Sequence, residues 1–161
     1  MPGLLYINLL RYFLLEKTRN FIYPIAFDKS MKNVVYDSRA KTGIPVFDKI
    51  TMGGFLRESI NLITGGPGSG KTTFVLECLW NGLTKYNENG MFVSFEDDLE
   101  NVRKDALVHG WDFSQYEKEK KFIFSSVVPY EQGLSLEMQK SQLKKDLLAS
   151  INKYNVKRIV I

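Results

Sequence analysis

The most constraining feature of this chain is a glycine-rich run, Gly-Gly-Pro-Gly-Ser-Gly-Lys-Thr-Thr, at residues 65–73. It follows a short apolar segment, 59–64, which we predict to be a buried strand, and it leads into a segment with helical patterning, 72–86. The glycines at 65, 66, 68 and 70 permit backbone conformations that are closed to residues with a Cβ atom, so successive N–H groups can point into a common cradle. A strand, a glycine loop and a helix in this order predict a site for phosphate groups.

Side chains in the run have distinct predicted roles at that site. The ammonium group of Lys71 would bind the β and γ phosphates of a nucleotide, assisted by the positive end of the following helix. The hydroxyl of Thr72 is the expected protein ligand of Mg²⁺. The alternative, a glycine-rich turn with an incidental lysine, is disfavoured by the match of spacing and context. The nucleotide-binding residues that we predict are Gly65, Gly66, Pro67, Gly68, Ser69, Gly70, Lys71, Thr72 and Thr73.

Turn signals divide the chain after residue 40 into alternating strand-like and helix-like segments. This alternation predicts an α/β fold with a mostly parallel sheet flanked by helices. Besides the strand and helix around the glycine run, we expect a short helical stretch at 46–50. Further strands are predicted at 91–95, 122–128 and 157–161, and further helices at 99–109 and 134–154.

Three acidic residues, Glu96, Asp97 and Asp98, follow the predicted strand at 91–95. Ligands of parallel α/β sheets bind outside the carboxyl ends of the strands, so Glu96 is well placed to orient and help deprotonate an attacking water. Asp97 could polarise the same water or hold Glu96 in place, and we take Glu96, Lys71 and Asp97 as candidate catalytic residues. The alternative for Glu96 is a solvated acid or a helix cap, and capping is the favoured role for Asp97 and Asp98.

The composition gives little support for disulfides, a metal site or DNA binding. One cysteine and one histidine are too few for an internal disulfide or a typical structural metal site, which indicates a cytoplasmic protein. The net charge of +4 is compatible with polyanionic ligands but does not by itself indicate DNA binding. Packing or capping is the favoured role of Trp80, Trp111, Cys78 and His109, and a solvated surface that of Lys140, Lys144 and Lys145.

Residues 1–40 form an apolar and basic extension to the domain that we place at 41–161. The most apolar run, 4–15, is shorter than the roughly 20 residues that cross a bilayer, and Arg11 interrupts it, so we predict neither stable membrane insertion nor export. We expect an amphipathic helix that packs on the domain or on a neighbouring subunit. Attachment to a membrane surface is an alternative, and a third interpretation is that translation starts at Met31.

Several motifs in order resemble the KaiC-like branch of the RecA/RadA ATPases. The resemblance covers residues 41–161 and implies a RecA-like fold that binds and hydrolyses ATP, with Mg²⁺, between the subunits of a ring or filament. Glu96 matches the first of the two catalytic glutamates of this family, and Asp97 stands where the second usually lies. The residues that carry the resemblance are Thr42-Gly43-Ile44-Pro45 with Asp48, Gly53-Gly54, the glycine run, Val93-Ser94-Phe95-Glu96-Asp97 and Gly110-Trp111-Asp112.

The resemblance also sets expectations for the end of the chain. In the family, the strand at 158–161 is followed by an aspartate that supports Mg²⁺ and then by a strand that lies beside the phosphate-loop strand, and this sequence ends before both. We therefore expect an open gap in the sheet, a truncated reading frame or fragment that is incomplete at the C-terminus, and weak ATP hydrolysis. Two alternatives stay open: a non-catalytic nucleotide-binding or assembly module, and a RecA-type protein of DNA recombination or repair.

Overall fold

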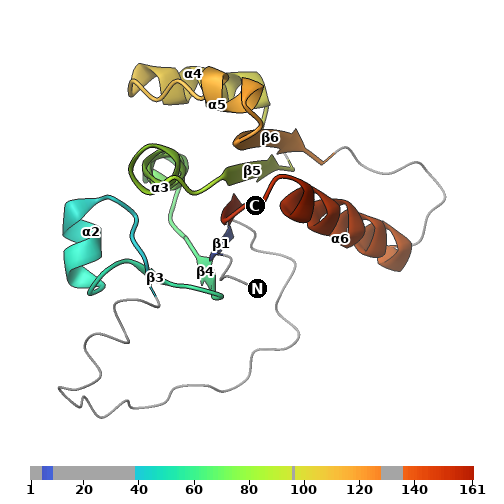
Figure 1. Cartoon of the computed structure of the whole chain (residues 1–161), viewed down its shortest axis with the longest axis horizontal. Coiled ribbons are helices and arrows are strands. Elements are labelled where there is room, and N and C mark those ends of the chain that lie inside the picture. Colours follow the sequence, from blue (N-terminus) through green and yellow to red (C-terminus); the bar gives the residue numbers. More distant parts are fainter. Residues whose placement is uncertain (1–4, 9–38, 96, 128–135) are drawn as a thin grey trace, which may run out of the picture.

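The computed structural model describes residues 5–8, 39–95, 97–127 and 136–161. These residues build a five-stranded parallel sheet with helices on both faces, as the α/β prediction requires (Figure 1). The strand order is β4-β1-β7-β5-β6. The strands are β1 (Leu5–Asn8), β4 (Ile60–Leu62), β5 (Gly90–Ser94), β6 (Phe122–Ser126) and β7 (Arg158–Val160).

Five helices and a small antiparallel pair complete the described part of the chain. The helices are α2 (Pro45–Ile50), α3 (Lys71–Tyr86), α4 (Leu99–Val108), α5 (Ser114–Lys118) and α6 (Leu136–Lys153), and the pair is β2 (Arg39–Ala40) with β3 (Phe55–Leu56). The strands and helices predicted after residue 40 are present, with ends that differ by a few residues or lie outside the described part of the chain. The predicted burial of the strand at 59–64 is wrong, because Ile60 and Leu62 of β4 are exposed. Helix α5 and the β2–β3 pair were not predicted, because elements of five and two residues are too short for a periodic pattern.

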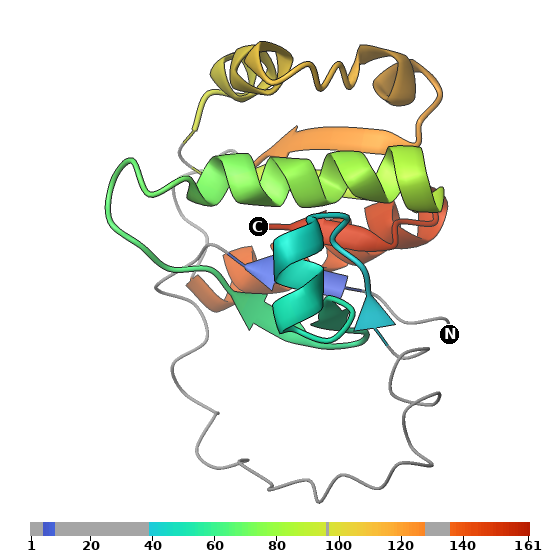
Figure 2. The ribbon, with the colours of Figure 1, turned by 90° about the vertical axis from the view of Figure 1, so that its left-hand side faces the viewer.

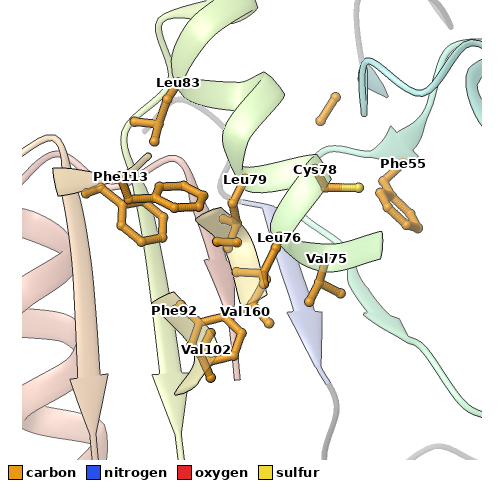
Figure 3. Packing of buried hydrophobic residues seen from close by; sticks show 13 residues of the cluster. Phe55, Val75, Leu76, Cys78, Leu79, Leu83, Phe92, Val102, Phe113 and Val160 are labelled. Atoms are coloured by element: carbon orange, nitrogen blue, oxygen red, sulfur yellow. The ribbon is translucent and has the colours of Figure 1, made fainter. Parts of the chain in front are cut away.

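Helix α3 covers one face of the sheet and carries the main core (Figures 2 and 3). Its apolar side chains pack against Phe92 of β5 and Val160 of β7, while α4 and α5 add side chains beside β6. Trp80 contacts the rings of Phe113 and Tyr116 edge-on at 5.3 and 5.7 Å, so its predicted packing role is confirmed. The fully buried members of this core include Val75, Leu76, Cys78, Leu79, Val102, Ala106 and Phe122.

Helix α6 covers the opposite face of the sheet (Figure 1). Met91 and Val93 of β5 point toward it, whereas Phe92 points toward α3. This alternation is the period of two expected for a strand, and burial on both faces explains why Met91, Phe92 and Val93 are all apolar.

The place where we expected an open gap is filled by the N-terminal strand β1. It runs parallel to both neighbours, with Tyr6 opposite Ile60 of β4 on one side and Ile159 of β7 on the other. The predicted helix is therefore wrong for residues 5–8, and so is the predicted gap. Buried N–H and C=O groups of two facing strands cost about 1 to 3 kcal/mol each when unpaired, and an extended segment between them satisfies these groups.

Attachment to a membrane surface and a translation start at Met31 stay untested predictions, because most of the N-terminal segment, 1–4 and 9–38, lies outside the described part of the chain. Within the described residues, none of the helices combines the length and the apolar character needed to cross a bilayer.

A partly buried ion cluster, centred on the buried Arg158, lies at the amino end of β7. Arg158, only 1% exposed, donates through Nε to Glu88 Oε2 at 2.6 Å and through Nη1 to the Cys78 carbonyl at 3.0 Å. Arg57 donates to the other oxygen of Glu88 at 2.7 Å. Gly82 of α3 makes room for the arginine, because a Cβ atom there would lie 2.6 Å from Arg158 Cδ. Cys78 is buried beside this cluster, and burial raises the pKa of its thiol to about 12, so the thiol stays neutral as expected of a packing residue.

The Glu88 carboxylate should stabilise the fold in a pH-dependent way. Burial alone would raise its pKa, but the charge of Arg158 and the hydrogen bonds from Arg57 and Arg158 outweigh burial and lower the pKa below the usual 4.5. Because the pKa is lower in the folded state, the stabilisation is complete above pH 4.5 and is lost as the pH falls through the folded-state pKa.

Replacing Glu88 by Gln should lower the free energy of unfolding at pH 7 by about 3 kcal/mol, because Arg158 is left buried without its counter-charge. The difference between wild type and variant should shrink as the pH falls from 4.5 through the lower folded-state pKa of Glu88, because wild-type Glu88 then becomes protonated as well. Urea denaturation at several pH values measures both effects. Glu100→Gln removes an exposed partner of Arg103 and serves as the control, with an expected change within about 0.5 kcal/mol. A difference for Glu88→Gln that stays constant with pH would contradict the assignment.

Candidate functional site

The glycine run forms the connection between β4, which ends at Leu62, and α3, which begins at Lys71. Gly68 and Gly70 adopt left-handed backbone conformations with φ of 73° and 80°. These two positions therefore require glycine, since side chains with a Cβ atom rarely adopt such angles. Apart from the adjoining residues of the chain, no heavy atom lies within 4 Å of a Cβ atom built on Gly66, Gly68 or Gly70, so this side of the loop is open.

Two hydrogen bonds within the loop, both to the Gly66 carbonyl, hold Lys71 against the loop backbone. Lys71 Nζ donates to the Gly66 carbonyl at 2.9 Å, and the Ser69 N–H donates to the same carbonyl at 3.3 Å. The first hydrogen bond of α3 follows directly, from the Phe74 N–H to the Gly70 carbonyl at 2.8 Å. The loop thus brings an ammonium group, backbone N–H groups and the first turn of a helix together at one exposed surface, which is the donor set that binds phosphate.

Asp97 and Asp98, in the acidic turn after β5, have different roles in the structure. The Asp98 carboxylate accepts from the Glu100 N–H at 3.0 Å and caps α4, which confirms the capping prediction for this residue. Asp97 is held through its backbone, since its N–H donates to Ser94 Oγ at 2.8 Å and its carbonyl accepts from the same hydroxyl at 3.0 Å. Its exposed carboxylate has no hydrogen bond or ion pair with the described residues and is available for another role. Glu96 lies outside the described residues, and its catalytic role stays a prediction.

The glycine run at 65–73, which we call the phosphate loop, and the acidic turn at 96–98 follow strands of the same sheet. β4 and β5 belong to one parallel sheet, and each segment follows the carboxyl end of its strand. This is the edge where ligands bind in open α/β sheets. Residues 65–73 and Asp97 therefore share the edge at which the sequence predicted a site.

A small pocket adjoins the phosphate loop. It has a volume of about 120 Å³ and lies between the first turns of α3 and the end of α4. The side chains from α4 were not predicted as site residues, because nothing in the sequence distinguishes them from the rest of that helix. His109 is the C-cap of α4, as expected, but its ring also stacks on Trp111 with centroids 4.8 Å apart, and this pair was not foreseen. The lining residues are Thr72, Thr73, Leu76, Asp105, Val108 and His109.

The segment at residues 42–48, which contributed to the resemblance, has a structural role. The Asp48 carboxylate accepts from the Thr42 N–H at 2.8 Å, the Thr42 hydroxyl at 2.7 Å and the Gly43 N–H at 2.9 Å. Asn81 of α3 donates to the Thr42 carbonyl at 3.0 Å. These bonds fix the turn before α2 against the helix that carries the phosphate loop.

Comparison with known proteins agrees with this geometry. The family described as "ATPase: KaiC" matches residues 40–161. The chain belongs to this family of KaiC-like ATPase domains. The match covers β4, the phosphate loop, α3 and the acidic turn, so the RecA-like P-loop fold is confirmed by sequence comparison as well as by the sheet.

The curated relatives are longer than this chain. A UPF0273 protein of Sulfurisphaera tokodaii is 36% identical over 132 residues, which cover 76% of this chain and 47% of the relative. A UPF0273 protein of Thermotoga maritima is 46% identical over 84 residues, covering 52% and 34%. The circadian clock oscillator protein KaiC of Acaryochloris marina is 31% identical over 137 residues, covering 84% and 26%. The chain thus spans about half or less of the length of these relatives.

The donor set fits a phosphate ligand better than a metal bound by protein alone. Within the described residues, no group of three or more His, Cys, Asp and Glu side chains could hold a metal ion. The loop instead offers one ammonium group, two adjacent threonine hydroxyls and open backbone. A divalent cation here would need oxygen atoms from a bound phosphate in addition to the threonine.

The different roles of Asp97 and Asp98 can be tested through stability. Asp98→Ala should lower the free energy of unfolding by about 1 kcal/mol because it removes the cap of α4. Asp97→Ala keeps the backbone bonds to Ser94 and should change it by less than about 0.5 kcal/mol. Urea denaturation of the two variants compares them directly. Equal losses would show that Asp97 also supports the helix.

Proposed function

We propose that this chain binds MgATP at the phosphate loop and that the complete protein hydrolyses ATP at an interface between subunits. The observation that carries the proposal is the loop itself, in which Lys71, the left-handed Gly68 and Gly70, and the first turn of α3 face one open surface. Membership of the KaiC-like ATPase family supports the same ligand.

The residues of the loop and of the acidic turn have different proposed roles. The loop N–H groups and Lys71 hold the phosphates, and Thr72 is the protein ligand for Mg²⁺, which when bound neutralises charge on the phosphate oxygens. Gly65, Gly66, Pro67 and Ser69 shape the loop, and Thr73 lies between it and the neighbouring pocket. Glu96 orients the attacking water, and Asp97 assists from the same turn.

The pocket beside α3 is suited to the base of the nucleotide. It begins at Thr72 and Thr73, so a ligand held by the loop can extend into it. Leu76 and Val108 supply apolar contacts for a flat ring, and Asp105 and His109 supply polar groups.

Exposed apolar side chains support an assembly of several copies. Val46, Ile50, Met52 and Leu56 lie on α2 and on the segment up to β3, and each is between 42% and 76% exposed. Apolar side chains that gather on one exposed segment are typical of contact surfaces. We propose that this segment contributes to the subunit interface.

The central test is calorimetric titration of the purified chain with MgATP. Lys71→Ala should weaken binding by about tenfold to a hundredfold, because it removes a charge-assisted contact worth about 1.5 to 3 kcal/mol. Lys118→Ala, at an exposed lysine on α5, removes the same charge and should leave the affinity unchanged. Absence of nucleotide binding by a folded wild-type chain would refute the proposal.

The pocket can be tested separately from the loop. Val108 is 82% exposed, so Val108→Trp should leave stability unchanged while its indole fills the pocket. The affinity for ATP should fall at least about fivefold, about 1 kcal/mol, whereas inorganic triphosphate should bind as it does to the wild type. Leu107→Trp, at the adjacent exposed position that does not line the pocket, is the matched control. Equal losses for ATP and triphosphate in Val108→Trp would place the base elsewhere.

A further inference from the structure

The strand that leads into the phosphate loop is joined to the sheet through β1. β4 stands at one end of the strand order, and its neighbour in the described part of the chain is β1, not β7. Three residue pairs link β1 to β4, and three link β1 to β7. Residues 5–8 therefore connect the phosphate-loop strand to the strands that carry the acidic turn.

Side-chain burial contributes little to holding β4 in place. Ile60 and Leu62 are 60% and 58% exposed, although both are apolar. By contrast, all three residues of β7 and all five of β5 are buried. Ile63, the residue after β4, packs partly buried against the main core, whereas the three residues of β4 itself depend mainly on backbone pairing with β1.

The two ends of the phosphate loop are anchored differently. On the α3 side, the helix packs through Val75, Leu76 and Leu79 into the main core, against β5 and β7. On the β4 side, the pairing of Leu62 with Asn8 is the last ladder contact before the loop begins. Displacement of β1 would leave the helical end of the loop in place, whereas the other end would keep the partial packing of Ile63 but lose the strand pairing that positions it.

We propose that β1 is a positioning strand for the phosphate loop, so that insertion of residues 5–8 between β4 and β7 and binding of nucleotide stabilise each other. The inference rests on the proposed function, because the ligand is the nucleotide assigned there. Coupling must be reciprocal: a ligand that favours the loop with β1 inserted also increases the protection of β1. The strand is short and arrives from a distant part of the sequence, so its insertion can be reversed while the core stays folded.

Hydrogen exchange on the wild-type chain tests the coupling without any substitution. Amides of residues 5–8 should be protected, and a saturating non-hydrolysable ATP analogue with Mg²⁺ should slow their exchange together with that of residues 60–62. Amides of β6, at the far edge of the sheet, should show a much smaller change. Unprotected amides at 5–8, or protection there that does not respond to bound nucleotide, would overturn the proposal.

A proline substitution tests it from the other direction. Ile7 is paired on both sides, opposite Asn61 and Val160, so Ile7→Pro removes a ladder hydrogen bond whichever neighbour its amide faces. The affinity for the ATP analogue should fall at least about tenfold, whereas Ile7→Val, which keeps the amide, should bind like the wild type. Adding a peptide with the sequence of residues 4–10 and a lysine tail should restore affinity to the proline variant, and a scrambled peptide should not.

The outcomes separate this proposal from the proposed function. A wild-type chain that binds the analogue, together with an Ile7→Pro variant that binds it equally well, would overturn the positioning role and leave nucleotide binding intact. A folded wild-type chain that binds no nucleotide would overturn both the function and the coupling. If Ile7→Pro does not fold, hydrogen exchange on the wild type decides.

Discussion

Backbone hydrogen bonding between parallel strands is the constraint on which the rest of this structure depends. Because the strands of the sheet run in one direction, the loop after β4 and the acidic turn after β5 meet at one edge. That edge needs a continuous sheet, and continuity between β4 and β7 is supplied by residues from the other end of the chain. Local sequence thus makes the phosphate loop, while long-range pairing determines where the loop lies.

Helix α3 couples the site to the core. Its first residues, Lys71 and Thr72, belong to the phosphate loop, and its next turns contribute Val75, Leu76 and Leu79 to the largest apolar cluster. The helix is also tied to the segment before α2 through Asn81 and the Thr42 carbonyl. A loop of exposed glycines is in this way attached to a helix whose next turns are buried in the main core.

Much of the fold after residue 40 could be predicted because its signals are local. The glycine spacing, the helical pattern of 72–86 and the apolar strand at 91–95 each require one element type, and the structure has them. Residues 5–8 could not be assigned in this way, since an apolar run fits a helix or a strand equally well. The strand is favoured because it pairs with the backbone of β4 and β7, which would otherwise lack partners on the facing sides. These strands lie more than 50 and 150 residues away in sequence.

In the site, too, features set by local sequence could be predicted, whereas those set by long-range contacts could not. The phosphate loop is contiguous and was predicted residue by residue, and the cap formed by Asp98 follows from its place before a helix. The pocket combines the start of α3 with Asp105, Val108 and His109 at the end of α4, and no spacing rule brings these helices together. The role of Asp48 was hidden for a similar reason, because it bonds backbone groups that its own turn brings close.

Gly82 and Arg158 have a consequence for how this domain can diverge. A glycine inside α3 lowers helix propensity by about 1 kcal/mol relative to alanine, yet any larger residue would collide with the guanidinium that Glu88 holds. The two positions are therefore constrained as a pair. In homologous sequences, a bulkier residue at position 82 should occur together with a shorter side chain at position 158, so that co-variation between them would record the buried arginine even where no coordinates exist.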